Sequence, residues 1–287
     1  MDTKFKKIVI VGMGLIGGSL GKALMKNGSA EDVTGICRRQ VSLDKAFDEN
    51  ALLHGGVDNY EEAVPGADIV VIATPVHVIK DVLDRLAKVI KDKNVIVTDA
   101  GSTKNEIVKH AEKYKDKFSF VGSHPLAGSE KSGVGNSSAE LFKGSVCILT
   151  PADDSKGKET ELISAMWKEA GVDTIDIMTP EKHDKNLAFS SHLPHIVSYA
   201  LAGTVEKEFP HTMAAAGFRD TTRIANSEEG LWSDIFMSNR ENVLETIRKY
   251  KEVLENIESS IRSQDEDTLK KTLKNCRGVL DDLFPET

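Results

Sequence analysis

A glycine-rich turn close to the start of the chain places the strongest constraint on the fold. Residues 7–11 form a short apolar run rich in β-branched side chains, Gly-Met-Gly-Leu-Ile-Gly follows at residues 12–17, and a helical pattern covers residues 19–26. A strand, a Gly-x-Gly-x-x-Gly turn and a helix in this order are typical of a dinucleotide-binding βαβ unit. The first glycine allows the tight turn, the second lets the backbone approach a pyrophosphate, and the third lets the helix pack closely.

The helix after this turn would present free backbone N–H groups and the positive end of its dipole to bound phosphates. We therefore predict that the turn binds the pyrophosphate of a nicotinamide dinucleotide. The predicted contacts are Gly12, Gly14, Leu15, Ile16 and Gly17. The alternative is a tight turn that binds no ligand.

Strand and helix patterns alternate through the first 180 residues. Apolar runs that predict strands lie at residues 7–11, 33–37, 68–73, 94–99, 118–122, 146–150 and 172–178. Strands that are apolar on both faces and separated by amphipathic helices predict a parallel sheet covered on both sides. The predicted fold class is α/β, with a Rossmann dinucleotide-binding domain over residues 1–180.

The pattern changes after about residue 180, where no convincing strand remains. Helical patterns cover residues 183–206, 212–218, 228–238, 240–263 and 265–284. The stretch 242–261 has apolar residues at helical spacing over a wide face, which indicates packing against another helix. We predict an all-helical dimerisation and substrate domain over residues 181–287.

The charge balance argues against some classes of partner. The chain of 287 residues has 37 lysines and arginines against 45 aspartates and glutamates, a net charge of −8. An acidic chain is poorly suited to binding nucleic acid or an anionic membrane surface, and no stretch approaches the ~20 apolar residues that a membrane-spanning helix needs. Three widely spaced cysteines indicate neither a disulfide framework nor a cysteine metal site. We expect a cytoplasmic protein that acts on a small molecule.

The end of the second predicted strand bears on the choice of cofactor. NAD-binding units usually place an acidic residue there to bind the ribose 2′-hydroxyl, but this chain has Cys37 followed by Arg38 and Arg39. An arginine pair could instead bind a 2′-phosphate, which favours NADP+ or the use of both NAD+ and NADP+. Stacking of Arg38 on the adenine, or a purely solvated role, remains open. Thr74 and Pro75 follow the third predicted strand and complete the predicted cofactor-binding set.

Two further strings follow predicted strands, where open α/β sheets bind their ligands. Asp-Ala-Gly-Ser-Thr-Lys occupies residues 99–104, and Ser-His-Pro-Leu-Ala-Gly-Ser-Glu-Lys-Ser-Gly occupies residues 123–133. A histidine beside a nicotinamide site is suited to act as a general base, because its ordinary pKa of about 6.5 allows proton transfer near neutral pH. The helical half adds Ser-His-Leu-Pro-His at 191–195, Gly-Phe-Arg-Asp-Thr-Thr-Arg-Ile-Ala at 217–225 and Leu-Trp-Ser-Asp-Ile at 231–235.

In this order the strings closely resemble the prephenate/arogenate dehydrogenase family of tyrosine biosynthesis, from Gly12 to about Asn239. The resemblance implies a Rossmann domain followed by a helical domain that forms an intertwined homodimer. It also implies oxidative decarboxylation of prephenate with NAD+ or NADP+ to give 4-hydroxyphenylpyruvate and CO₂. With arogenate as substrate the product would be tyrosine.

The resemblance also implies roles for single residues. His124 matches the catalytic histidine that takes the hydroxyl proton, and Ser102 matches the serine that hydrogen-bonds and orients it. Arg223 matches an arginine that binds a substrate carboxylate, and His195 a histidine that lines the substrate site. The remaining predicted substrate-binding residues are Ser129, Glu130, Arg219 and Trp232, the last of which matches a tryptophan placed near the partner subunit's site.

Simpler roles are open for several of these residues. His192 and His195 could form a metal pair, but no third cluster of ligands accompanies them, so we predict no metal. Trp232 could serve only as a packing anchor of the dimer. The other histidines are expected on the surface or in loops: His54, His77, His110, His183 and His211.

Three other functions compete with prephenate dehydrogenase. An arogenate dehydrogenase would favour an acidic residue near the substrate's ammonium group, and Glu130 is a candidate. A β-hydroxyacid dehydrogenase would normally place a lysine base on the first long helix of the second half, where this chain has Ser-His-Leu-Pro-His. A nucleotide-sensing protein without catalysis would not need Ser102, His124 and Arg223.

Overall fold

The computed structural model describes residues 5–128, 131–152, 157–205 and 210–284. By its contacts the chain divides into two compact units, residues 1–239 and 240–287. The first unit contains a sheet and the helices that cover it, together with four helices that follow the last strand. The second unit is a pair of helices. Each unit is described by itself.

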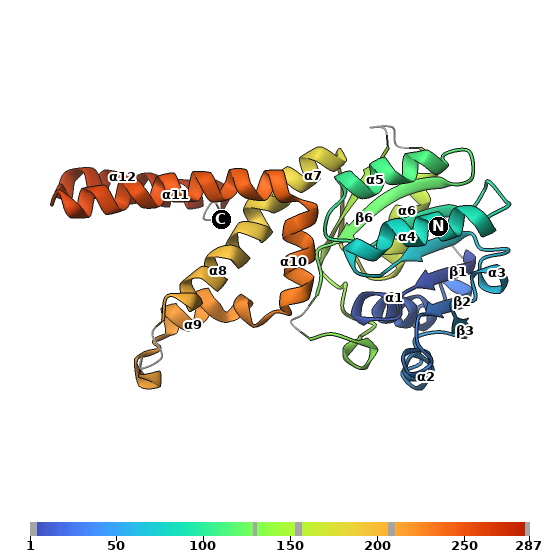
Figure 1. Ribbon diagram of the computed structural model, residues 1–287. Coiled ribbons are helices and arrows are strands. Elements are labelled where there is room, and N and C mark those ends of the chain that lie inside the picture. Colours follow the sequence, from blue (N-terminus) through green and yellow to red (C-terminus); the bar gives the residue numbers. More distant parts are fainter. Residues whose placement is uncertain (1–4, 129–130, 153–156, 206–209, 285–287) are drawn as a thin grey trace. The chain divides into compact units, whose positions relative to one another are not determined.

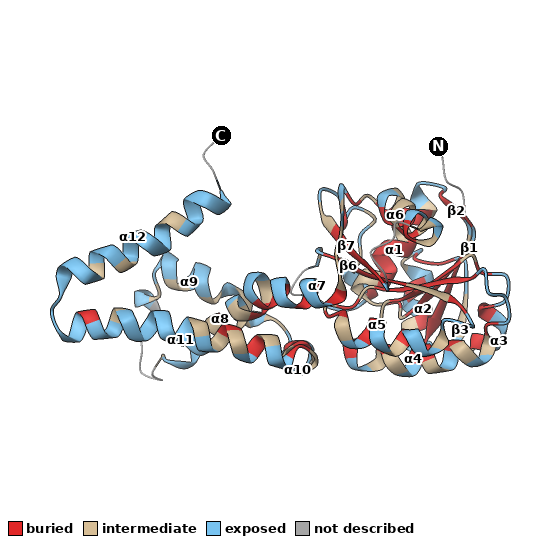
Figure 2. Cartoon of the chain, turned by 90° about the horizontal axis from the view of Figure 1, so that it is seen from above, coloured by how far each residue is buried: buried red, intermediate tan, exposed pale blue. Residues whose placement is uncertain are grey.

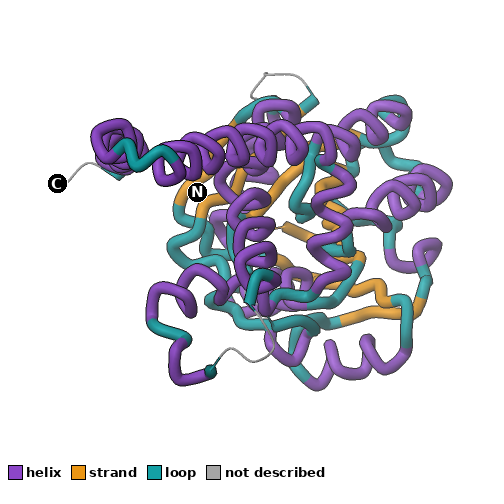
Figure 3. Tube along the Cα trace, turned by 60° about the vertical axis from the view of Figure 1, so that its left-hand side comes forward, coloured by secondary structure: helices purple, strands orange, loops and turns teal. Residues whose placement is uncertain are grey.

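The first unit is built on an eight-stranded sheet of order β3-β2-β1-β4-β5-β6-β7-β8. Figure 1 labels β1, β2, β3 and β6 of this sheet, and Figure 3 draws its strands in orange. Neighbouring strands from β3 to β6 are parallel, β7 is antiparallel to β6, and β8 is parallel to β7. The strands are β1 Phe5–Val11, β2 Ala30–Cys37, β3 His54–Val57, β4 Ile69–Ile72, β5 Ile96–Asp99, β6 Ser119–Pro125, β7 Val146–Pro151 and β8 Thr174–Ile177. The predicted α/β class is confirmed, but β7 and β8 reverse direction and β3 was not predicted.

Helices cover both faces of the sheet, as Figure 2 shows from above. On one face α1 (Leu15–Lys26), α2 (Gln40–Asp48) and α6 (Lys158–Glu169) bury a cluster that includes Leu20, Leu43 and Trp167. The other face is covered by α3 (Tyr60–Ala63), α4 (Val76–Val89) and α5 (Asn105–Ala111), which bury Leu83 and Ile107. The central strands are apolar on both sides because each side meets a helix layer.

The helices after β8 begin with α7 (Pro180–Leu187), whose N-cap Thr179 accepts a hydrogen bond from the Lys182 N–H. A π-helical turn, Ala188–His192, joins α7 to α8 (Leu193–Gly203). The unit ends with α9 (Ala216–Thr222), a 3₁₀ turn η5 (Arg223–Asn226) and α10 (Glu229–Ser238). These helices group with the sheet by contact, so the change from strand to helix near residue 180 is not where the compact units divide.

The second unit is a helical hairpin of α11 (Arg240–Arg262) and α12 (Glu266–Leu283). The turn between them uses Gln264 at φ +57, and the Asp265 side chain caps α12 by accepting the Thr268 N–H at 3.0 Å. No residue of α12 is buried, which leaves its apolar side chains in solvent. In the part of the chain that the structure describes, no helix combines the length and the apolar character needed to cross a membrane.

Close packing of α1 against β1 makes a prediction for stability. A Cβ atom added at Gly17 would lie 2.1 Å from the backbone oxygen of Gly12. Overpacking of this kind costs about 2–3 kcal/mol, so we expect Gly17→Ala to lower the free energy of unfolding by about that amount. The matched control is Gly14→Ala, because a Cβ at Gly14 meets nothing within 4 Å and its φ is −92. Chemical denaturation of both variants measures the difference, and equal stabilities would contradict the packing argument.

Candidate active site

The turn between β1 and α1 has the shape of a phosphate cradle. Gly12 takes a φ of +98, and a Cβ there would lie 2.7 Å from the Ala73 backbone oxygen. Gly14 is the N-cap of α1, faces open space and provides no capping side chain, so the first N–H groups of the helix are free for a ligand. Leu15 and Ile16 are half-buried in its first turn. The residues present therefore fit a dinucleotide pyrophosphate.

The edge of the sheet beside this turn places the other predicted cofactor residues. Cys37 is buried at the end of β2, whereas Arg38 and Arg39 are exposed. Thr74 follows β4, and its Oγ1 is buried without a hydrogen-bond partner among the described residues. A buried hydroxyl without a partner costs free energy, and a ligand bound over the turn would supply one.

A pocket of about 790 Å³ brings together five predicted residues from three parts of the chain. The loop after β5 contributes one of them, β6 another, and the helices after β8 the other three. The five are Ser102, His124, His195, Arg223 and Trp232. The pairing of β5 with β6 explains why Ser102 and His124 lie close together, because the carboxyl ends of neighbouring parallel strands lie side by side.

His124 is held by a chain of hydrogen bonds that the sequence did not reveal. Its Nδ1 lies 2.9 Å from Nε2 of His183, and Nδ1 of His183 lies 2.8 Å from Oδ1 of Asp184. His183 is fully buried on α7, so its expected place on the surface or in a loop is wrong. Ser102 lines the same pocket, and its predicted hydrogen bond to His124 stays a prediction.

The carboxylate of Asp184 also caps a neighbouring helix. Its Oδ1 accepts the Lys104 N–H at 2.8 Å and its Oδ2 accepts the Asn105 N–H at 2.9 Å, at the start of α5. The Lys104 side chain forms a fully buried ion pair with Asp99. The backbone oxygen of Asp184 accepts from Asn239 Nδ2 at 2.7 Å. One residue thus connects the sheet edge, α7 and the end of α10.

These contacts determine which nitrogen of His124 is free. A carboxylate can only accept, so His183 carries its proton on Nδ1 and its Nε2 accepts from His124 Nδ1–H. Burial lowers the pKa of His183, and burial also places the pKa of His124 well below its usual value. His124 is therefore neutral at neutral pH, and its Nε2 lone pair is available to a ligand in the pocket.

One part of the pocket wall is aromatic and basic. The rings of His195 and Trp232 stack at a centroid distance of 3.4 Å and an interplanar angle of 23°. Burial, with a contribution from Arg223, lowers the pKa of His195 to about 4. His195 is therefore an uncharged hydrogen-bonding group, and its Nδ1 is buried without a partner in the described structure. Positive charge on this wall comes from Arg223.

Not every predicted residue reaches the pocket. Arg219 is exposed, donates from Nε to the Ala214 backbone oxygen at 2.8 Å, and does not line the pocket. Arg223, which does line the pocket, belongs to the 3₁₀ turn η5 that follows α9. Ser129 and Glu130 lie outside the described residues.

Trp232 lies in the pocket of its own chain. His192 is buried with Nδ1 3.2 Å from Asn239 Nδ2.

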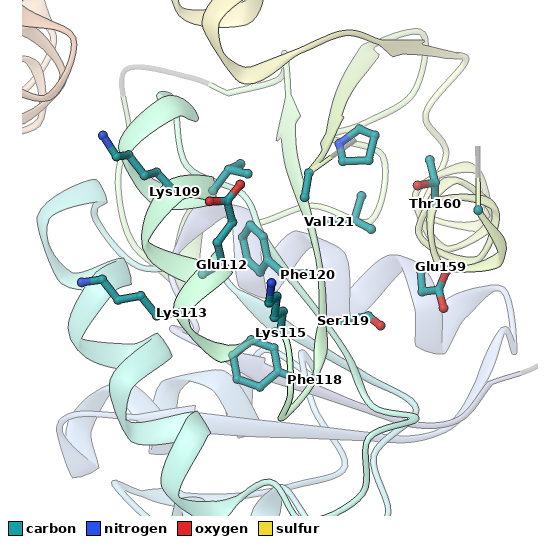
Figure 4. A pocket seen from close by; sticks show the side chains of 15 residues that line it. Lys109, Glu112, Lys113, Lys115, Phe118, Ser119, Phe120, Val121, Glu159 and Thr160 are labelled. Atoms are coloured by element: carbon teal, nitrogen blue, oxygen red, sulfur yellow. The ribbon is translucent and has the colours of Figure 1, made fainter. Parts of the chain in front are cut away.

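A second cavity, of about 900 Å³, lies between α5 and α6 at the start of β6 (Figure 4). Lys109, Glu112 and Lys113 border it on one side, Glu159 and Thr160 on the other. None of the residues that the sequence predicted for a site lines this cavity. Among the described residues, no group of three histidine, cysteine or acidic side chains could hold a metal ion there or elsewhere.

The site combines the parts that a proton-coupled oxidation of a small anion needs. A phosphate cradle and a neutral histidine base lie at the carboxyl edge of one sheet, and a guanidinium, that of Arg223, lines the same pocket as the base. Guanidinium groups bind carboxylates in a bidentate way, and a histidine with a free Nε2 can accept a hydroxyl proton.

Comparison with known proteins agrees with this geometry. The family model for the nucleotide-binding domain of prephenate dehydrogenase matches residues 20–176, and the model for its dimerisation domain matches residues 179–275. The chain is 35% identical to a cyclohexadienyl dehydrogenase of Zymomonas mobilis, over 96% of this chain and 95% of that protein.

Two solved structures resemble the whole chain. Prephenate dehydrogenase from Aquifex aeolicus, in complex with hydroxyphenyl propionate and NAD+, gives a TM-score of 0.87 at 31% identity and covers 98% of this chain and 99% of that one. Arogenate dehydrogenase from Synechocystis gives a TM-score of 0.82 at 29% identity and covers 96% of this chain and 99% of that one. The chain therefore belongs to the prephenate dehydrogenase family of oxidoreductases.

Proposed function

We propose that this protein catalyses the NAD(P)+-dependent oxidative decarboxylation of prephenate to 4-hydroxyphenylpyruvate and CO₂, a step of tyrosine biosynthesis. The observation that supports it most is the chain Asp184–His183–His124, which leaves a neutral histidine base in a pocket that Arg223 also lines. The reaction requires a base for the ring hydroxyl and a cation for a substrate carboxylate, and the pocket offers both.

A nicotinamide dinucleotide held at the turn of Gly12, Gly14 and Gly17 would supply the hydride acceptor for C4 of the substrate ring. Nε2 of His124 takes the proton of the 4-hydroxyl, and His183 stabilises the resulting positive charge through the hydrogen bond at Nδ1. Loss of the ring carboxylate as CO₂ supplies the electrons that make the ring aromatic. The reaction releases no net proton, so His124 returns its proton to the phenol oxygen of the product.

Substrate binding is assigned to the part of the pocket wall that Arg223, His195 and Trp232 form. Arg223 binds a carboxylate, and the His195–Trp232 stack packs against the substrate ring and excludes water. Ser102 positions the reacting hydroxyl or His124 itself. Arogenate is the second candidate substrate, because the solved arogenate dehydrogenase shares the fold over nearly its full length.

For the cofactor we propose that NADP+ is used at least as well as NAD+. The supporting observation is that Cys37 is followed by exposed Arg38 and Arg39, which can pair with a 2′-phosphate. The same edge contains Asp58, but its carboxylate is paired with Arg85 at 3.1 Å.

The helices after residue 180 are proposed to form the dimerisation and substrate domain. Support comes from the match to a dimerisation-domain model and from apolar side chains exposed on the hairpin: Leu244, Val253, Leu254, Leu273, Leu280 and Phe284.

The mass of the protein in solution tests the dimer. We expect sedimentation equilibrium to give twice the chain mass of 31.3 kDa. The double variant Leu254→Glu with Leu280→Glu should shift the measured mass toward that of a single chain. A stable monomer at micromolar concentration would contradict the dimer.

Turnover of the predicted substrates tests the function. Absorbance of the reduced nicotinamide is followed while prephenate and arogenate are each combined with NAD+ and NADP+. We expect turnover with prephenate, and a rate with NADP+ at least equal to that with NAD+ if the arginine pair binds the 2′-phosphate. Folded protein that turns over neither substrate would contradict the proposed function.

Loss of the hydrogen bond at His124 Nδ1 tests the positioning role of His183. We expect His183→Gln to lower kcat about 10–100-fold while the affinity for the dinucleotide stays unchanged. His110→Gln is the control, because His110 on α5 bonds to Asp84 on α4, away from the pocket. An unchanged kcat in His183→Gln would contradict the assignment.

The pH dependence of the wild type gives a second test. The value of kcat/KM should stay level as the pH falls through 6.5, because the pKa of His124 lies below that value.

A further inference from the structure

We propose that His192 donates a hydrogen bond from its Nε2–H to an oxygen of the substrate, and that Asn239 positions this donor. The inference rests on the proposed function and adds a second histidine to the substrate site. His192 ends the π-helical turn, is buried, and lines the same pocket as His124. Asn239 follows α10 and is also buried.

The hydrogen bonds of Asn239 determine which ring nitrogen of His192 holds the proton. Nδ2 of Asn239 lies 2.7 Å from the backbone oxygen of Asp184 and 3.2 Å from Nδ1 of His192. A backbone oxygen can only accept, so the Asn239 atom that faces it is the amide nitrogen. An amide nitrogen can only donate, so Nδ1 of His192 accepts its second hydrogen. The proton of a neutral His192 is therefore on Nε2.

Burial and packing keep His192 in this state. Desolvation lowers its pKa to about 4, so the ring is neutral near pH 7 and carries a single proton. The ring also packs edge-on against Trp232, at a centroid distance of 6.3 Å and an interplanar angle of 74°. Asn239 and Trp232 together hold the ring in one orientation.

The Nε2–H group of His192 makes no hydrogen bond with any residue that the structure describes. A donor in a buried ring costs free energy unless a partner satisfies it, and a ligand in the pocket that His192 lines can supply that partner. The partner must accept a hydrogen bond. In the proposed substrate the oxygens without a proton belong to the two carboxylates and, in prephenate, to the keto group.

The two histidines thus present opposite groups to one pocket. His124 presents the lone pair of Nε2, because its Nδ1–H is donated to His183. His192 presents Nε2–H, because its Nδ1 accepts from Asn239. Both arrangements depend on Asp184, whose carboxylate binds His183 and whose backbone oxygen binds Asn239. The pocket therefore contains an acceptor for the hydroxyl proton and a donor for another substrate oxygen.

Two substitutions of His192 test the donor. His192→Leu has no N–H group, whereas His192→Gln places an amide N–H near the position of Nε2. We expect His192→Leu to lower kcat/KM for prephenate about tenfold, mainly through KM, because one hydrogen bond to the substrate is lost. His192→Gln should recover most of this loss, and the dissociation constant for NAD+ should stay at the wild-type value in both variants.

Arogenate identifies the accepting oxygen, because it has an ammonium group in place of the keto group. A fall in kcat/KM for prephenate alone, recovered in His192→Gln, assigns the hydrogen bond to the keto oxygen. A recoverable fall for both substrates assigns it to a carboxylate.

Nitrogen NMR of the unliganded protein tests the positioning role of Asn239 without turnover. At pH 7 the ring of His192, assigned from the signal lost in His192→Gln, should be neutral with its proton on Nε2. An ionised acid can only accept, so Asn239→Asp should move the proton to Nδ1 and lower kcat/KM as His192→Leu does.

Four results would overturn the inference. They are a proton on Nδ1 of His192 in the wild type, a proton that stays on Nε2 in Asn239→Asp, an unchanged kcat/KM in His192→Leu, and equal losses in His192→Leu and His192→Gln, which would mean a packing role. A wild type that turns over neither substrate would instead contradict the proposed function, and the NMR signal would still test the proton position on His192.

Discussion

The active site depends on the carboxylate of Asp184, which is shared between two kinds of donor. It accepts two backbone N–H groups at the start of α5 and the Nδ1–H of His183. The carboxylate is buried, and a buried charge persists only where hydrogen bonds satisfy it. Removing any of these donors would leave the buried carboxylate with one hydrogen bond fewer, which costs free energy. The same carboxylate therefore places α7 on the sheet edge and fixes the proton on His183.

The chemistry of the pocket follows from that constraint. Because His183 can only accept at Nε2, His124 must donate from Nδ1 and keep its Nε2 free. Burial prevents both rings from being charged at rest. In the proposed reaction, the positive charge of a proton that His124 Nε2 takes from the substrate would be stabilised by the hydrogen bonds that lead through His183 to the Asp184 carboxylate. The helical half contributes the neutral His195 and also Arg223, which we propose to bind a substrate carboxylate.

How far the sequence could predict this structure depended on the distance between interacting residues. The strand–turn–helix at Gly12 to Gly17 is local, so its fold was predictable. Strand β3 was not predictable, because its sequence His-Gly-Gly-Val has no apolar run and the strand is held in the sheet by its pairing with β2. The direction of β7 was not predictable either, since a strand pattern has no direction. His183 was missed because its partner lies 59 residues away; the only local signal was a His-Asp pair in the first turns of a helix that begins with proline. The π-helical turn at Ala188–His192, which contributes Ser190, Ser191 and His192 to the pocket, gives no sequence signal.

The protonation state of His124 is the central claim of this account, and nitrogen NMR of the histidine rings measures it most directly. The spectrum of the unliganded protein labelled with ¹⁵N at pH 7, with His124 assigned from the signal lost in His124→Asn, reports which ring nitrogen holds the proton. The account predicts a neutral ring with the proton on Nδ1 and a free Nε2. A proton on Nε2, or a charged ring at pH 7, would contradict it.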